Sequence, residues 1–251
     1  MNTTPHSRRS GFSLVEVLAA MAVLSVIVLI VSRLFADSSN AWDAGTRRMD
    51  SNLIARSAIE FLARELSQAS ADKNVRIKVD SERFGSWERN RSDELYFIGM
   101  NSVAEYRSSS PYRDVQQIRY GVITYPSGRL SLLRFVVEKE DSGHFTAYST
   151  PGSPWWTPLL AYNPAWGNAM ADNLVAFRVN LFDTNGVYQA NYDSQTHGTP
   201  LYADLYLSLV DDRDATRAEG MSAGDRESYV AGKARRYSTR VYFNNRFEGM
   251  P

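Results

Sequence analysis

The most unusual chemical group of the chain lies near its N-terminus. Glu16 is the only ionisable residue between Phe12 and Ser32. An ionised side chain in hydrocarbon costs on the order of 2.5 to 3.5 kcal/mol on insertion scales, so such a group needs a partner. The positive end of a helix supplies part of the compensation, and a cation on a neighbouring molecule would supply the rest. The alternative is a Glu that simply reaches to the lipid headgroups.

The apolar run around Glu16 is long enough to cross a bilayer. As a helix, the residues from Phe12 to Ser32 span about 30 Å. Arg8 and Arg9 precede the run and predict a cytoplasmic N-terminus under the positive-inside rule. Two alternatives remain. The first is a cleaved secretory signal, but it needs small residues at its distal cleavage site, where this chain has residues 31–35 (VSRLF). The second is a twin-arginine signal, but Gly11 and the nearby Glu16 follow the arginine pair and fit it poorly.

The composition excludes several classes of function. Lys plus Arg and Asp plus Glu both number 28, so no net positive field attracts nucleic acid, and we expect no nucleic-acid partner. The chain has no Cys, which excludes disulfides, a thiolate nucleophile and Cys-ligated zinc. Its 251 residues suit one moderate globular domain with an appendage.

A search for catalytic motifs finds none. The three histidines, His6, His144 and His197, show no metal-binding spacing. No phosphate-binding loop, dinucleotide fingerprint or nucleophile elbow occurs in the sequence. The acidic pair Glu138 and Glu140 is typical of a solvated strand end. We therefore expect no enzyme activity and no cofactor, with a membrane-anchored periplasmic enzyme or ligand-binding domain as the alternative.

Two groups of acidic residues raise the question of calcium, which prefers hard oxygen ligands. The alternative, which we favour, is that turns simply prefer Asp and Asn. The two groups are Asp183, Asn185 and Asp193, and Asp211, Asp212 and Asp214.

A separate segment, residues 149–167, combines four prolines with three tryptophans and is too interrupted for regular structure. Trp155, Trp156 and Trp166 are candidate interface residues, because aromatic side chains often anchor partners. The alternative is that they cover the core of their own domain.

The remaining chain predicts an α+β domain. Residues 35–72 contain no proline, and Gly45 is a candidate bend. Apolar residues recur there every three or four positions, which predicts an amphipathic helix that lies on a sheet. The expected apolar stripe is Ile54, Ala58, Phe61, Leu62, Ala63 and Leu66. Beyond this helix, alternating apolar and polar residues separated by turn-forming residues predict a mainly antiparallel β head over 73–251, with loops at 149–167 and 211–236. The expected strands are 75–79, 94–100, 115–124, 130–138, 174–182, 203–210 and 238–243, with turns at 127–128 and 184–186.

The segment Gly11-Phe12-Ser13-Leu14-Val15-Glu16-Val17-Leu18-Ala19-Ala20 resembles the processing motif of type IV pilins and type II secretion pseudopilins. The resemblance implies a leader over 1–11, cleavage between Gly11 and Phe12 by a prepilin peptidase, and methylation of the Phe12 amine. It also implies a transmembrane helix over 12–34 in the inner membrane, a periplasmic head, and other pilin or pseudopilin subunits as partners. Glu16 would then meet the Phe12 amine of a neighbouring subunit and set the register of assembly.

Motifs in the head narrow the resemblance. The order and spacing of residues 134–135, 173–178, 205–213 and 238–243 are similar to the minor pseudopilin J class, and more similar still to the Verru_Chthon cassette protein C group of prepilin-like proteins. This resemblance implies a minor structural subunit of a pilus-like or secretion-like filament. The sequence does not distinguish secretion, pilus formation and DNA uptake.

Overall fold

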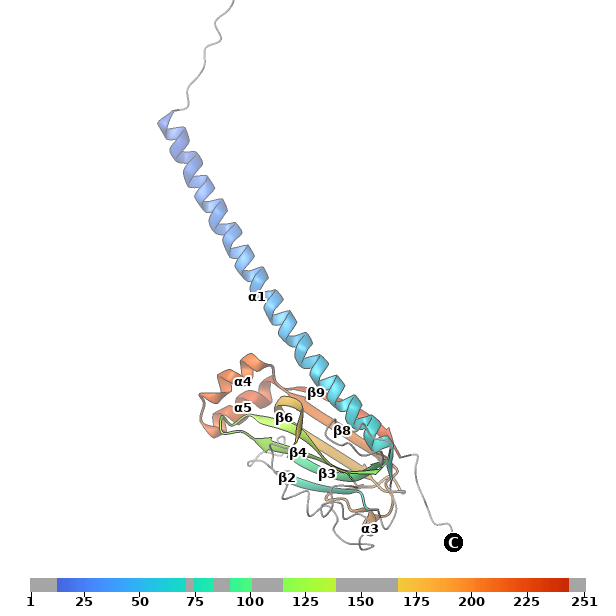
Figure 1. Ribbon diagram of the computed structural model, residues 1–251. Coiled ribbons are helices and arrows are strands. Elements are labelled where there is room, and N and C mark those ends of the chain that lie inside the picture. Colours follow the sequence, from blue (N-terminus) through green and yellow to red (C-terminus); the bar gives the residue numbers. More distant parts are fainter. Residues whose placement is uncertain (1–12, 71–74, 84–90, 101–114, 139–166, 244–251) are drawn as a thin grey trace, which may run out of the picture. The chain divides into compact units, whose positions relative to one another are not determined.

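The computed structural model describes residues 13–70, 75–83, 91–100, 115–138 and 167–243 (Figure 1). The chain forms two compact units, Met1–Arg48 and Met49–Pro251. The first unit holds the apolar part of a long helix, and the second holds the end of that helix and the β-rich head. The α+β fold predicted from the sequence is confirmed, with a long N-terminal helix and a mostly antiparallel sheet.

Helix α1 runs from Leu14 to Ser67 (54 residues). The helix passes through Gly45 without interruption and ends at Ser67 rather than at residue 72. An Arg in its last turn, Arg64, complements the negative end of the helix dipole. Leu-, Ala- and Val-rich sequence without proline explains the continuity, since no residue removes a backbone donor from the helix.

Nine strands form one sheet in the described part of the head. The order along its main path is β1-β3-β4-β5-β6-β8-β9, with β2 paired to β3 and β7 to β6. All pairs are antiparallel except one parallel bridge, between Ser92 and Phe177, that links β3 to β6. The strands are β1 (Ala69–Ser70), β2 (Lys78–Arg83), β3 (Arg91–Met100), β4 (Val115–Thr124), β5 (Leu130–Glu138), β6 (Asn168–Phe182), β7 (Tyr188–Gln189), β8 (Tyr202–Leu209) and β9 (Arg235–Tyr242).

The expected strands agree with this sheet to different degrees. The bounds of β4 and β5 are as predicted, and β3, β8 and β9 differ by at most three residues at either end. Strand β6 starts six residues earlier than expected, at Asn168, because irregular pairing with β5 lets it continue beyond the regular alternation. Strand β2 is displaced toward the C-terminus, since residues 75–77 come before its first ladder pair.

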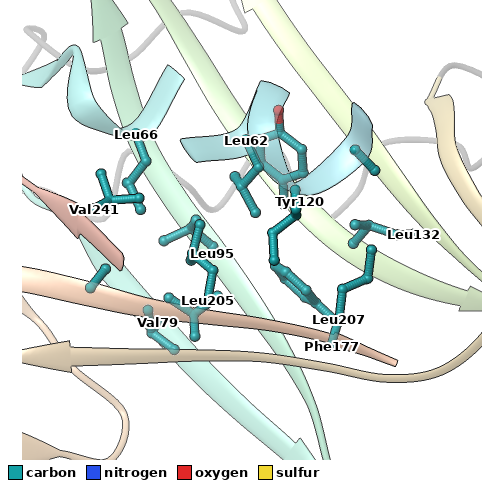
Figure 2. Packing of buried hydrophobic residues seen from close by; sticks show 14 of the residues in the cluster. Leu62, Leu66, Val79, Leu95, Tyr120, Leu132, Phe177, Leu205, Leu207 and Val241 are labelled. Carbon is teal, nitrogen blue, oxygen red and sulfur yellow. The ribbon is translucent and has the colours of Figure 1, made fainter. Parts of the chain in front are cut away.

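The end of α1 closes the hydrophobic core of the head. Its buried apolar residues are Ala55, Ala58, Ile59, Leu62 and Leu66, at the spacing of one helix face. Figure 2 shows Leu62 and Leu66 in one cluster with Tyr120, Leu205 and Val241 of the sheet. The apolar stripe expected from the sequence is displaced at its start: Ile54 is exposed, whereas Ala55 and Ile59 are buried.

The segment 211–236 corrects a prediction. The sequence predicted an exposed loop there, but the structure contains helices α4 (Asp212–Glu219) and α5 (Ala223–Lys233) between β8 and β9. Asp211 caps α4 by accepting a bond from the Asp214 N–H, and Ser222 caps α5 by accepting one from the Asp225 N–H. Side-chain caps stabilise helices that are too short to form alone.

A short helix, α3 (Ser194–His197), was not expected from the sequence. The turns at 127–128 and 184–186 are present, with Gly128 and Gly186 at positive φ. Trp155, Trp156, Trp166 and the rest of residues 149–166 lie outside the described residues.

Candidate functional site at the N-terminal segment

Ser13 and Glu16 form a reciprocal cap at the start of α1. The Ser13 N–H donates to Glu16 Oε2 (2.8 Å), and the Glu16 N–H donates to Ser13 Oγ (3.2 Å). This capping box satisfies two backbone donors that the first turn of a helix leaves without partners. Glu16 therefore stabilises the helix start within its own chain, in addition to any role between subunits.

The sequence contains a signal for this cap that our prediction did not use. Ser13-x-x-Glu16 before an apolar run is the sequence pattern of a capping box. The role predicted for Glu16, a bond to the Phe12 amine of a neighbouring subunit, concerns a second molecule. Gly11 and Phe12 lie outside the described residues, so their prediction stays a prediction.

The apolar part of α1 is exposed along its whole length. All residues from Leu14 to Asp43 are exposed. Within the described residues, α1 is the one helix long and apolar enough to cross a membrane. Apolar side chains exposed over such a length are stable only in lipid or against other apolar helices. This segment is consistent with a membrane anchor.

Comparison with known proteins supports the same interpretation. Residues 6–32 match the family described as the prokaryotic N-terminal methylation motif. The match spans Gly11, Phe12 and Glu16, and the chain therefore carries a type IV pilin-like prepilin motif. A comparison with curated proteins finds no match to the chain.

A buried ion pair joins α1 to the sheet. Glu65 of α1 is 1% exposed and Arg134 of β5 is 3% exposed. Arg134 Nε donates to Glu65 Oε2 (2.9 Å), and its second nitrogen donates to Oε1 (2.6 Å). The Tyr120 hydroxyl donates to the same carboxylate (2.5 Å), and the Arg134 guanidinium lies 5.5 Å from the ring centroid of Phe61. These contacts fix the rotation of the last helical turns on the sheet.

Tyr120 acts in this cluster as a donor. Burial, and then the negative charge of Glu65, raise the pKa of the Tyr120 hydroxyl well above its usual value. The hydroxyl therefore stays protonated at any physiological pH. The sequence did not indicate this cluster, because Glu65 has the spacing of a core position but the chemistry of a surface residue.

Asp193, one of the candidate calcium ligands, holds another part of the head together. It pairs with Arg76, whose Nε donates to Oδ1 (2.9 Å), and it caps α3 by accepting from the Gln195 N–H (3.0 Å). Partial burial raises the pKa of Asp193, but the bonds from Arg76 and Gln195 outweigh burial and hold it below the usual value. Asp193 thus connects the residues before β2 to the start of α3.

The other candidate calcium ligands also serve local structure. Asp183 Oδ1 accepts from the Asn185 and Val187 N–H groups in the β6–β7 turn (2.9 Å each). In the second group, Asp212 pairs with Arg129 and Asp214 accepts from a tyrosine hydroxyl. Among the described residues, no group of three or more acidic or histidine side chains gathers as it would around a metal ion. The absence of a cofactor, with calcium as the alternative, stays a prediction.

A pocket of about 290 Å³ lies between the two helices α4 and α5 and the adjacent end of the sheet. Arg129 bonds across its rim to Glu219 (2.5 Å), Asp212 (2.8 Å) and Thr216 (2.8 Å) of α4, and to Asn173 of β6 (3.2 Å). These bonds connect α4 to the β4–β5 turn and the sheet.

Arg226 of α5 forms a second connection at this pocket. Its guanidinium donates to the carbonyl oxygens of Ala218 (3.0 Å), Glu219 (3.1 Å) and Met221 (3.4 Å). The side chain passes so close to Gly128 that a Cβ there would lie 1.5 Å from an Arg226 nitrogen. Gly128 is therefore required both by its φ of +81° and by the path of Arg226.

Proposed function

We propose that this chain is a structural minor pilin or pseudopilin subunit. A prepilin peptidase cleaves it between Gly11 and Phe12, and the processed helix anchors it in the inner membrane with the head in the periplasm. It then joins other subunits through this helix in a pilus-like or secretion-like filament. The observation that carries the proposal is the prepilin motif over residues 6–32 at the start of a helix with an exposed apolar surface.

The capping box adds a physical argument for assembly. Glu16 Oε2 already accepts one bond from its own Ser13 N–H, which holds the carboxylate at the helix start. A carboxylate accepts more than one bond. The fixed carboxylate is therefore available to a cation from a neighbouring subunit without a large loss of side-chain entropy. The Phe12 amine is the cation that cleavage would create.

The alternative function is a periplasmic enzyme or ligand-binding domain that uses the helix only as an anchor. It differs from the first proposal in what it requires of Glu16. An anchor needs only apolar length, whereas subunit assembly needs the carboxylate. The same difference separates the two functions experimentally.

The processing step is tested by mass spectrometry of the protein purified from a host that has a prepilin peptidase. The expected N-terminus is methylated Phe12. A matched variant, Gly11→Leu, should keep Met1 or Asn2 as its N-terminus because the peptidase site is lost. An unprocessed native chain, or a cut after residue 34, would overturn the proposal.

The role of Glu16 is tested by comparing Glu16→Leu, Glu16→Gln and Ser25→Leu in that host. Glu16→Leu removes both the charge and the cap, whereas Glu16→Gln removes the charge and keeps an acceptor for the cap. Ser25→Leu adds an apolar side chain to the same helix and is the control. All three should be processed. Both Glu16 variants should reach the sheared filament fraction about tenfold less than wild type or lower, because the ion pair with the amine of the neighbouring subunit is lost. Normal incorporation of both would favour the anchor alternative.

A further inference from the structure

We propose that the pocket under helices α4 and α5 is a binding site for a small, uncharged and mainly apolar molecule. This site is independent of the N-terminal helix and of subunit assembly. It lies in the head unit, and the residues that line it come from β4–β6, the turn between β4 and β5, Val210 directly after β8, and the two helices. Its volume of about 290 Å³ is close to the lower end of the range for ligand pockets.

The walls of the pocket determine that the ligand is apolar. Leu130, Leu174 and Val210 line the side formed by the sheet, and Ala215 and Ala218 line the side formed by α4. An apolar cavity of about 150 Å³ already accepts benzene in another protein. A space about twice that size, with a mainly apolar lining, accommodates one or two rings or a short aliphatic chain.

The small side chains of α4 leave this space open. Ala215 and Ala218 are both buried, and Ala218 is 2% exposed. Leu or Ile at these positions would reach toward the sheet and fill the gap, as larger residues do in most protein cores. Three of the lining residues, Val175, Val210 and Ala215, also pack together in a small cluster with Val230, and this cluster joins the helices to the sheet.

The charges at the rim determine that the ligand is neutral. Arg129 bonds to Glu219, Asp212 and Thr216, and Arg226 is occupied by three backbone carbonyls. An anionic headgroup would have to displace these internal bonds, and displacing bonds to charged groups is costly. The two arginines thus hold α4 and α5 in place over the pocket, and the ligand binds through apolar contacts alone.

The test uses the full chain in detergent and a neutral photoreactive probe, trifluoromethyl-phenyl-diazirine, with labelled peptides located by mass spectrometry. Labelling of peptides within 211–230 should saturate with probe concentration and should be reduced by excess toluene. The apolar part of α1 provides an internal reference, since detergent delivers probe to it without saturation. Labelling of 211–230 that rises linearly, or that toluene leaves unchanged, would overturn the proposal.

Filled variants locate the site. Ala218→Leu and Ala215→Leu should each weaken saturable labelling about tenfold, with a thermal midpoint equal to or above that of wild type. The matched control, Ala231→Leu, lies on α5 but does not line the pocket, and it should label as wild type does. If the filled variants fold and their labelling is unchanged, the pocket is only a gap in the packing and the proposal is overturned. If both filled variants unfold, the toluene competition in the native chain decides.

Discussion

At the scale of single residues, the bond between Glu65 and Arg134 joins α1 to the sheet in addition to the apolar contacts of the same helix face. Both groups are almost fully buried, and each satisfies the charge of the other. Glu65→Gln would leave the Arg134 cation buried without a counter-charge. We expect this change to lower the free energy of unfolding by about 3 to 5 kcal/mol, measured by urea unfolding followed by circular dichroism.

A double variant controls for packing at the same place. Glu65→Met combined with Arg134→Met removes both charges and keeps apolar volume, so it should recover most of the loss. If the double variant is as unstable as Glu65→Gln, the cluster stabilises the head by shape and not by charge.

The pKa of Asp193 predicts a dependence of stability on pH. Its pKa is lower in the folded chain than in the unfolded chain, where it is about 3.9. Folding therefore favours the ionised form, and this contribution is complete above about pH 5 and is lost as pH falls through the folded pKa. Asp193→Asn should be less stable than wild type at pH 7, with a difference that shrinks toward pH 2.

The measurement is the free energy of unfolding of both proteins across that range. Asn at position 193 can still accept the bond from the Gln195 N–H, so the comparison isolates the charge. A difference that stays constant with pH would exclude the Arg76 pair as its source.

At this scale the sequence identified Glu16 as a candidate functional residue, because a carboxylate within a long apolar run is costly and rare. It did not show Glu65, although Glu65 is the more buried of the two. Its partner Arg134 lies 69 positions away, and a single sequence contains no information on which strand meets which turn of the helix. The cap between Ser13 and Glu16 could have been predicted from the sequence, because its two residues are only three positions apart.

At the scale of elements, the turn between β4 and β5 depends on Gly128, and Gly186 in the β6–β7 turn is a matched control. Both have positive φ, but only Gly128 is in contact with another side chain. Gly186→Ala should cost about 1 kcal/mol from backbone strain alone. Gly128→Ala should cost more, since Arg226 must leave its three carbonyl partners.

Thermal or urea unfolding measures both changes, and a third variant assigns the cause. In an Arg226→Ala background, Gly128→Ala should cost no more than Gly186→Ala does. A larger cost in that background would show that some other contact requires glycine.

The strands and the helices of the head were not equally predictable. Strands β4 and β5 follow regular alternation and flank a Ser-Gly turn, so local sequence determines their bounds. Helices α4 and α5 are short and rich in charge, and α5 contains two glycines, so the composition of this segment resembles that of an exposed loop. The sequence features that mark their starts are the capping residues Asp211 and Ser222. Asp and Ser are equally common in loops, so these two residues alone do not predict a helix.

At the scale of the whole molecule, the division after Arg48 predicts where the chain can be shortened. A chain that begins at Met49 keeps the helix face that closes the core, so it should fold and remain soluble without detergent. A chain that begins at Gln68 lacks this face and should not fold. The measurement is the thermal midpoint, which for the first chain should lie within a few degrees of the full-length protein.

The end of α1 has a consequence for the order of events during synthesis. Leu66 shares its hydrophobic cluster with Val241, which the ribosome adds 175 residues later. At about 5 to 20 residues per second, the helix waits on the order of 10 to 35 seconds for the last strand of its own core. During that time its apolar face lacks the contacts that β9 supplies, although Arg134, the partner of Glu65, has been synthesised well before. Whatever holds the membrane end of the nascent chain must also keep this face from aggregating until β9 arrives.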